Sequence, residues 1–570
     1  MTLKRSASAI FVLSCLTLTA CGGSSGGGDS TPPVTNNAPT DISLSSAVVD
    51  ENAMGATIGT LSATDADSGD SFTFTTSNSS FAISGTSLTL AEGVAMNFEA
   101  NSSVDVAVTV TDAAGSSFSK TLTVSVNDLL DTYQFNNKNG EGSSVSYSGQ
   151  TARHVLIAEL NNYIGNQLQT DLGDGTLATR AEVLAKLDSY FRMDADTYEL
   201  TAESMLIGFT ADPEQISLKD ISSSHKNLVA KVAGNDAGGQ HAMWNDGDFA
   251  GWGAKGSTTP EGLVDIFFGL LADNADEILG GASRVDADGN PLPVYVTSTG
   301  LDLKQLIQKF LLMSVAYSQG ADDYLDNNTA GKGLLADNSA NVTGKPYTAL
   351  EHIYDEGFGY FGAARDYLDY SDDEVASKGG RDGWQGKHDT DNNGTFDLLS
   401  EYNFGNSVNA AKRDRGATTE LDYSKTAMDN FLLGRQLIAD TNAALTEAQM
   451  TELEGYVSKA LDAWERSIVA TVVHYINDTS ADLANFDSDN FNFTDTAKHW
   501  AEMKGFALGI QFNRASPMTS AQFEQLHNLL ADAPVLTDAA AVTQYRADLM
   551  TARDLIETVY GFDAADVANW

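Results

Sequence analysis

The hydrophobic pattern of the chain changes its period once, near residue 131, and this change limits the folds that the chain can adopt. Residues 40–130 alternate apolar and polar side chains, as in VDVAVTVTDAAG, and are rich in Thr, Val and Ser. Alternation with a period of two predicts half-buried strands, and Gly, Asn and Asp at turn spacing separate about seven of them. The sequence therefore predicts an all-β sandwich for residues 40–130.

From about Thr151 onward the apolar residues repeat with helical spacing. In LTEAQMTELEGYVSKALDAWERSIV, Leu453, Val457 and Trp464 fall on one face, and the pair of Thr446 and Gln449 just before them is typical of a capping box. We therefore expect residues 131–570 to form a large, mostly α domain, a helical array or bundle with long Gly- and Asp-rich connections. The predicted fold class is multidomain, with a sandwich followed by a helical domain, as the length of 570 residues also favours.

The first 20 residues are typical of an export signal. Two basic residues precede an apolar stretch, residues 7–20, that is too short to span a bilayer as a helix. The end of this stretch, LTAC, resembles the lipobox of bacterial lipoproteins. The resemblance implies that residues 1–20 are removed, that Cys21 carries a lipid anchor, and that the protein is an outer-membrane lipoprotein, because Gly22 rather than Asp follows the cysteine. An ordinary cleaved signal with an incidental cysteine is the alternative.

Composition excludes several classes of function. Residues 21–39 are rich in Gly, Ser, Pro and Asn without an apolar period, which predicts a flexible tether. Cys15 and Cys21 are the only cysteines, so the body of the chain has no thiol for a disulfide, a thiolate metal site or a nucleophile. The 78 acidic and 33 basic residues give a formal net charge of −45, which repels nucleic acid and favours cations as partners.

Short acidic motifs within residues 40–130 occur in a characteristic order. The motifs DENA, DAD, NFEA, TDAAG and VND follow one another as in cadherin-type repeats, and the stretch resembles one such repeat over its whole length. This resemblance implies that acidic side chains at the domain ends bind calcium, a hard ion that takes about six to eight oxygen ligands. The residues that the resemblance nominates are Glu51, Asp65, Asp67, Glu99, Asp112, Asn127 and Asp128.

This stretch also departs from the cadherin pattern. Ser125 stands two residues before Asn127, where the family usually has Asp, and only one repeat is present, whereas calcium in cadherins lies between consecutive repeats. A calcium-free sandwich whose Asp residues only form turns is the alternative. If the repeat acts as in cadherins, it contacts protein or glycan partners.

A second acidic stretch, KHDTDNNGTFDLLSE, predicts a calcium-binding loop in the helical domain. Its spacing fits the first part of an EF-hand-type loop, with Gly394 at the sharp turn. The last ligand position of such a loop holds Ser400, and the carboxylate comes one residue later. The predicted ligands are Asp389, Asp391, Asn393, Thr395 through its carbonyl, Asp397 and Glu401. An Asx-rich turn that needs no ion is the alternative.

Two pairs of His and Glu residues offer candidate ligands for iron or zinc. His352 and Glu356 are spaced i and i+4 with Asp355 at i+3, and His499 and Glu502 are spaced i and i+3. Their order, His before Glu, differs from the Glu-x-x-His of di-iron bundles and from the His-x-x-x-His of zinc proteases. Ordinary packing or capping of the helices is the alternative.

The strings YTALEHIYDEGFGYFG, DTDNNGTFDLLSEYNFG and AKHWAEMKGFALGIQF resemble a family of bacterial lipoproteins of unassigned function, over roughly residues 131–570. Members tend to be encoded beside imelysin-type lipoproteins, which are linked to iron acquisition. The resemblance implies a non-enzymatic envelope protein that binds a ligand or partner, in a setting of metal uptake; calcium-dependent adhesion through the β-sandwich is the alternative. Outside the Gly- and Ser-rich tether the sequence contains no Gly-x-Ser-x-Gly motif, and it has no nucleotide fingerprint, so an enzyme, such as a metal-dependent hydrolase, is the least favoured class.

Overall fold

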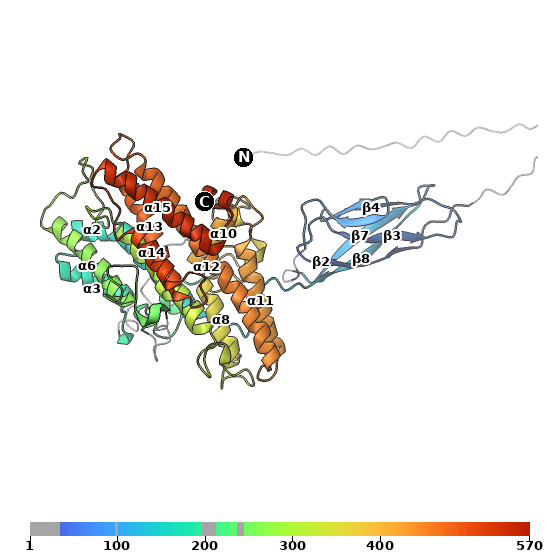
Figure 1. The fold of residues 1–570 in the computed structure, drawn as a ribbon. Helices are drawn as coiled ribbons and strands as arrows, with labels where there is room; N and C mark the ends of the chain where they lie inside the picture. Colours follow the sequence, from blue (N-terminus) through green and yellow to red (C-terminus); the bar gives the residue numbers. More distant parts are fainter. Residues whose placement is uncertain (1–34, 97, 99–100, 197–212, 236–243) are drawn as a thin grey trace, which may run out of the picture. The chain divides into compact units, whose positions relative to one another are not determined.

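The structure is a computed structural model, and it describes residues 35–96, 98, 101–196, 213–235 and 244–570. The chain divides into two compact units, one that ends at Leu129 and one that runs from Leu130 to Trp570. The first unit consists of strands and the second is mostly helical (Figure 1). This arrangement confirms the predicted multidomain fold class.

The β unit contains two four-stranded sheets. One has the strand order β1-β3-β6-β5 and the other the order β2-β8-β7-β4. Each pairing within them is antiparallel except that of β2 with β8, which is parallel. The strands are β1 Asp41–Leu44, β2 Val48–Asp50, β3 Thr57–Thr64, β4 Thr73–Thr76, β5 Phe81–Ser84, β6 Ser87–Leu90, β7 Ser103–Thr111 and β8 Ser117–Asn127.

Apolar and polar residues alternate along the strands, and this explains why the two sheets pack face to face. In β7, Val106, Val108 and Val110 are buried, whereas the residues between them are more exposed. They join Ile42, Leu88 and other apolar residues from both sheets in one core. Burial of each such side chain contributes roughly 1.5–3 kcal/mol, so the period-two pattern alone specifies which face of each strand is turned inward.

The helical unit is organised around its longest helix, α12 Glu447–Leu483. It packs against α10 Gly405–Arg415, α11 Tyr423–Asp440, α13 Phe493–Ala507 and α15 Ala539–Tyr560 (Figure 1). The face predicted from the sequence is confirmed, because Leu453, Val457 and Trp464 are buried. The capping box is confirmed too: the Thr446 hydroxyl accepts from the Gln449 amide nitrogen, and the Gln449 side chain accepts from the Thr446 backbone.

The other α-helices of the described residues pack on this group or on one another. They are α1 Ser148–Asn162, α2 Leu168–Gly173, α3 Arg180–Phe191, α5 Leu218–Ile221, α6 Pro260–Leu279, α7 Leu303–Leu311, α8 Ala349–Phe361, α9 Asp372–Val375, α14 Ser520–Leu530 and α16 Ala564–Asn569. The described part of the helical unit also has π-helical segments at Tyr163–Gln167, Leu312–Tyr317 and Gly320–Tyr324. Among the described residues, no helix combines the length and apolarity that a bilayer span requires.

Candidate metal-binding sites

The predicted calcium loop brings three carboxylates together. One oxygen each of Asp389, Asp391 and Glu401 lies within 4.8 Å of the other two. No Lys or Arg of the described residues forms a salt bridge with any of the three. We name these residues the loop triad. It concentrates negative charge that no side chain of the described part of the helical unit neutralises directly.

Side-chain caps on the backbone fix the shape of this loop. Asp389 accepts hydrogen bonds from the amides of Asn393 and Gly394 at 3.0 and 2.8 Å. Asn393 in turn accepts from the amide of Thr395 at 2.9 Å. Gly394 has a φ of 97°, in the left-handed region where glycine carries no steric penalty. These Asx-type turns curl residues 389–395 around the carboxylates.

Glu401 closes the loop from its other end. Its Oε1 accepts from the amide of Thr390 at 2.8 Å, and its Oε2 accepts from the amide of Asp397 at 2.7 Å. The residue is only 6% exposed, and this burial raises the pKa of its carboxyl group above the ordinary value. The structure thus places Glu401, rather than Ser400, beside the first two acids of the loop.

The other predicted ligands of the loop form hydrogen bonds within the loop itself. Asp397 accepts from the amide of Leu399 and from the hydroxyl of Ser400, both at 2.8 Å, and it is not among the converging carboxylates. The Thr395 hydroxyl donates to Asn393 Oδ1. The loop therefore offers three carboxylates at its centre, with the Asn393 and Asp397 side chains bound to the loop itself.

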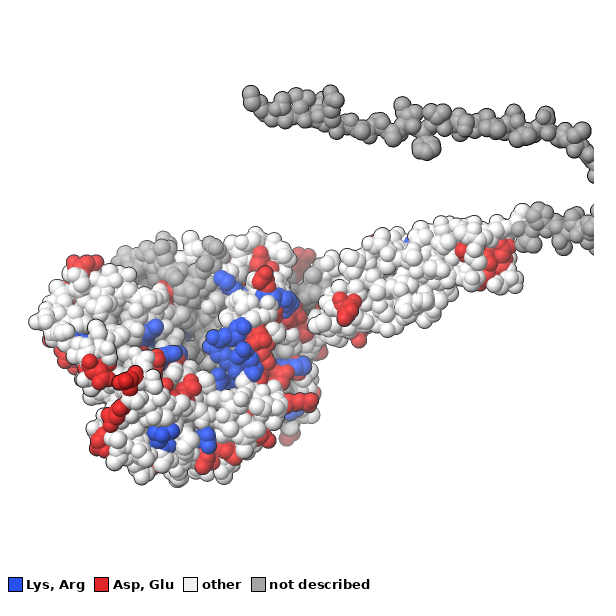
Figure 2. All heavy atoms as spheres, turned by 90° about the horizontal axis from the view of Figure 1, so that it is seen from above, with Lys and Arg blue, Asp and Glu red and all other residues white. Residues whose placement is uncertain are grey.

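The β unit contains a second acidic group. One oxygen each of Asp65, Asp67 and Asp70 lies within 4.8 Å of the others, and we name these residues the β triad. Figure 2 shows Asp and Glu side chains gathered at one end of this unit. Burial, followed by the charges of Asp112, Asp65 and Asp67, raises the pKa of Asp70. The sequence prediction missed Asp70, which follows the DAD motif at no characteristic spacing.

Two asparagines hold this end of the sandwich together. Asn36 donates to Asp112 Oδ2 at 2.9 Å, and the backbone amide of Asn37 donates to Asp67 Oδ2 at 2.6 Å. Asp112 lies just beyond the last paired residue of β7, at the tip of the hairpin with β8. Asp65 and Asp67 of the DAD motif and Asp112 of the TDAAG motif therefore belong to one end of the unit.

The other nominated residues of the β unit lie at the opposite end of the β7–β8 ladder. Glu51 accepts from the amides of Phe98 and Leu129 at 2.7 and 2.6 Å, and Asn127 donates to Asp50 at 2.8 Å. The pKa of Asp128 is raised by burial and then by the charge of Glu51. The paired ladder between the two ends spans roughly 27 Å at 3.4 Å a residue. Glu99 lies outside the described residues.

The candidate iron or zinc ligands are not brought together. Asp355 is fully buried, accepts from Arg435 Nε at 2.8 Å and from Tyr133 Oη at 3.0 Å, and so has a cation of its own. His352 lies 3.8 Å from Glu356 and directs its Nδ1 to the carbonyl of Ser146. None of the metal-compatible groups of three acids or histidines found among the described residues includes them.

The second pair behaves in the same way. His499 Nδ1 lies 2.8 Å from Asp482, which raises the pKa of the imidazole, and Glu502 pairs with Lys309 at 3.4 Å. Helical spacing placed these residues on common faces, but each side chain has found a partner on a neighbouring helix or segment. His352, Asp355, Glu356, His499 and Glu502 thus lie in packing roles in this structure.

The molecule belongs to the class of two-unit proteins with a β-sandwich followed by a helical body. A family model described as Domain of unknown function (DUF4856) matches residues 270–533, which lie within the helical unit and include the loop triad. The search of curated proteins found no match. The family's description assigns no activity, so the geometry of the sites carries the functional argument.

Proposed function

We propose that this protein is a calcium-binding lipoprotein of the cell envelope that binds a ligand or partner and catalyses no reaction. The observation that carries this proposal is the convergence of Asp389, Asp391 and Glu401 within 4.8 Å without a neutralising Lys or Arg among the described residues. Like charges so close repel one another unless a cation enters, and ligands that are all oxygen atoms suit calcium.

Calcium fits the loop triad better than iron or zinc does. Calcium accepts about six to eight oxygens at roughly 2.3–2.6 Å, so three carboxylates, the Thr395 carbonyl and water are sufficient to surround it. Zinc and iron sites in proteins generally include His or Cys. Neither the loop triad nor the β triad contains a His or Cys residue.

The location at the envelope rests on the sequence of residues 1–21, with Cys21 as the site of the lipid anchor at the outer membrane. Its setting in metal uptake rests on the likeness of residues 131–570 to lipoproteins encoded beside imelysin-type proteins. Calcium-dependent adhesion to a protein or glycan is a second candidate function. It is favoured by the β triad, because an acidic group at one end of a cadherin-like sandwich suits calcium shared with a partner.

Calcium titration of the chain that begins after Cys21 tests the proposal. We expect at least one bound calcium per chain and a fall of the melting temperature when EGTA is added. Asp389→Asn in the loop triad should remove most of this fall, whereas Asp67→Asn in the β triad reports on the β unit separately. Asp286→Asn is the matched control, since Asp286 caps a tight turn through the amides of Asp288 and Asn290. A chain without bound calcium would contradict the proposal.

A further inference from the structure

A cavity in the helical unit differs in charge from the rest of the chain. It has a volume of about 460 Å³ and is lined by residues of α1, α7 and the segment 402–408. None of its lining residues is Asp or Glu, and Lys304 is the only lysine or arginine among them. In a chain with a formal net charge of −45, this hollow is the kind of place where an anion can approach without repulsion from its walls.

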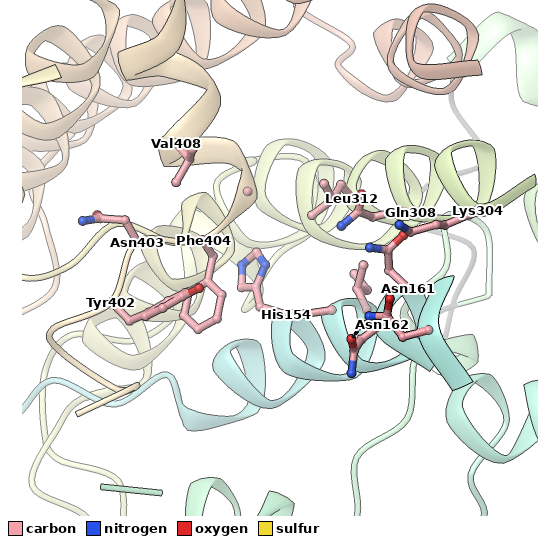
Figure 3. Close-up of a pocket in the computed structure, with 14 residues that line it drawn as sticks. His154, Asn161, Asn162, Lys304, Gln308, Leu312, Tyr402, Asn403, Phe404 and Val408 are labelled. Atoms are coloured by element: carbon pink, nitrogen blue, oxygen red, sulfur yellow. Dashed lines mark hydrogen bonds between the residues drawn. The ribbon is translucent and has the colours of Figure 1, made fainter. Parts of the chain in front are cut away.

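One wall of the cavity carries polar groups with free hydrogen-bonding capacity. Figure 3 shows Lys304, Gln308 and Asn161 together on this side. The Gln308 carbonyl oxygen accepts from Lys309 Nζ at 2.7 Å, which leaves its amide nitrogen as a donor. Asn161 also lines the cavity, and its side chain is only partly buried. Lys304 forms no salt bridge with any described carboxylate.

The opposite wall is aromatic. The rings of His154 and Phe404 are stacked with their centroids 4.9 Å apart and their planes inclined by 15°, and Tyr402 lies beside Phe404 (Figure 3). His154 Nε2 donates to the carbonyl of Gly359 at 3.1 Å, so Nδ1 remains an acceptor. Burial lowers the pKa of His154 to about 4, which keeps the ring neutral. Aromatic faces opposite amide groups suit a ligand with apolar ring edges and several hydroxyl groups.

The aromatic wall continues directly from the loop triad. Glu401 immediately precedes Tyr402 in the sequence, and Tyr402 pairs with Lys387 in an antiparallel bridge across the base of the loop. The amide of Asn403 donates to the carbonyl of Gly386 at 3.0 Å, and the amide of Phe404 donates to the carbonyl of Gly362 at 2.7 Å. An ion bound by Glu401 would therefore fix the end of the segment that forms this wall.

We infer that this cavity binds a small hydroxylated carboxylate, the chemical class of the sugar acids, and that calcium in the loop strengthens this binding. Lys304 would pair with the carboxylate, Gln308 and Asn161 would bind hydroxyl groups, and the ligand's carbon skeleton would lie against Tyr402 and Phe404. The inference gives a ligand class to the proposed function and rests on it for the role of calcium. Because coupling between two sites is reciprocal, the ligand must also strengthen calcium binding.

Isothermal titration of the chain that begins after Cys21 with D-galacturonate tests the inference, with D-galactose and acetate as probes that lack the carboxylate or the hydroxyl groups. We expect D-galacturonate to bind more tightly than either. Lys304→Met and Gln308→Glu should each weaken it at least tenfold, whereas Lys459→Met, an exposed lysine on α12, should leave it unchanged. Replacing calcium with EGTA should weaken it at least fivefold, as should Asp389→Asn.

Failure of the pocket and failure of the calcium proposal give different results. Three results would overturn the ligand class: equal affinity for D-galacturonate and acetate, full affinity in both Lys304→Met and Gln308→Glu, or no binding of D-galacturonate. Calcium binding is measured in a separate titration, so these results leave the calcium proposal standing or falling on its own. Binding of D-galacturonate that is identical in calcium and in EGTA would overturn the coupling. Circular dichroism melts of each variant show that a lost affinity reflects the cavity and not unfolding.

Discussion

Asp355 on α8 and the carboxylates of the loop triad were all predicted as metal ligands, and the structure surrounds them in opposite ways. On α8, Asp355 and Glu351 are fully buried and face Arg435 of α11, whose Nε lies 2.8 Å from Asp355 and whose Nη1 lies 3.2 Å from Glu351. In the loop triad, Asp389, Asp391 and Glu401 converge with no such cation among the described residues. Acidic residues at a favourable spacing are common to both groups, and only the source of positive charge differs.

The difference teaches where an ion is needed. A guanidinium that is fixed by hydrogen bonds neutralises buried carboxylates permanently, so the α8 group is a part of the core. The Arg435 Nη2 also donates to the Ser144 hydroxyl at 2.8 Å, which ties this ion-pair group to the segment before α1. The loop triad lacks this internal charge among the described residues, and under the proposed function a cation from solution supplies it.

The largest effect should follow from removing the internal cation. Arg435→Met leaves the buried Asp355 without its cation and leaves Glu351 with Lys138, at 3.6 Å, and we expect the free energy of unfolding to fall by about 3–5 kcal/mol, in calcium and in EGTA alike. Urea denaturation measures the change. Adding Asp355→Asn to this variant should recover part of the loss, because the uncompensated charge of Asp355 disappears. A loss below about 1 kcal/mol would show that the pair does not stabilise the core.

Removing calcium, the external cation of the proposed function, should have the next largest effect. When calcium is present at about 100 times its Kd, ligand linkage predicts about 2.7 kcal/mol of added stability. EGTA should remove this contribution from the unaltered chain. The Asp389→Asn variant should not bind calcium at this site, so it should melt at nearly the same temperature with and without EGTA. An EGTA effect of full size in Asp389→Asn would place the responsible site elsewhere.

The two units could be predicted from the sequence because the spacing of apolar residues depends directly on which side chains are buried. The alternation in β7 and the helical face of α12 are both reproduced in the structure. The carboxylates of Asp389, Asp391 and Glu401, which the sequence predicted as ligands of one ion, lie close together, since short loops keep sequence neighbours close in space. The sequence prediction failed for Asp355, because the partner Arg435 comes from another helix 80 residues later, and no local pattern reveals which cation will face a helix.

Another buried acid, Glu465, sharpens the comparison, because it has neither a salt bridge to a described residue nor access to solvent. Glu465 of α12 accepts from the hydroxyls of Tyr317 and Tyr560 at 2.9 and 2.6 Å, and from Ser516 and Asn513. Burial raises the pKa of Glu465 above the ordinary value of 4.5. The folded state therefore binds more protons than the unfolded state above pH 4.5, and the contribution of this group to stability falls as the pH rises through its folded pKa.

The variant Glu465→Gln tests whether the contribution of Glu465 to stability falls as the pH rises. The free energy of unfolding of the unaltered chain, minus that of the variant, should decline as the pH rises above about 4.5, because glutamine cannot lose a proton. At low pH the two chains should differ by only about 1 kcal/mol, the net contribution of one rearranged hydrogen bond. Urea denaturation across this pH range measures the difference. A difference that grows with pH would mean that Glu465 is stabilised as a carboxylate by its four donors.

The smallest effect should come from an ion pair in water. Lys425 Nζ lies 2.8 Å from Asp429 one turn later on α11, with the side chains 57% and 37% exposed. Water and salt screen this pair, so Lys425→Met should change the free energy of unfolding by no more than about 0.5 kcal/mol. The contrast with Arg435→Met, on the same helix, isolates burial as the cause, since both substitutions remove one positive charge next to a carboxylate. Similar losses in the two variants would instead point to helix propensity or net charge, and the distinction between internal and external cations would lose its basis.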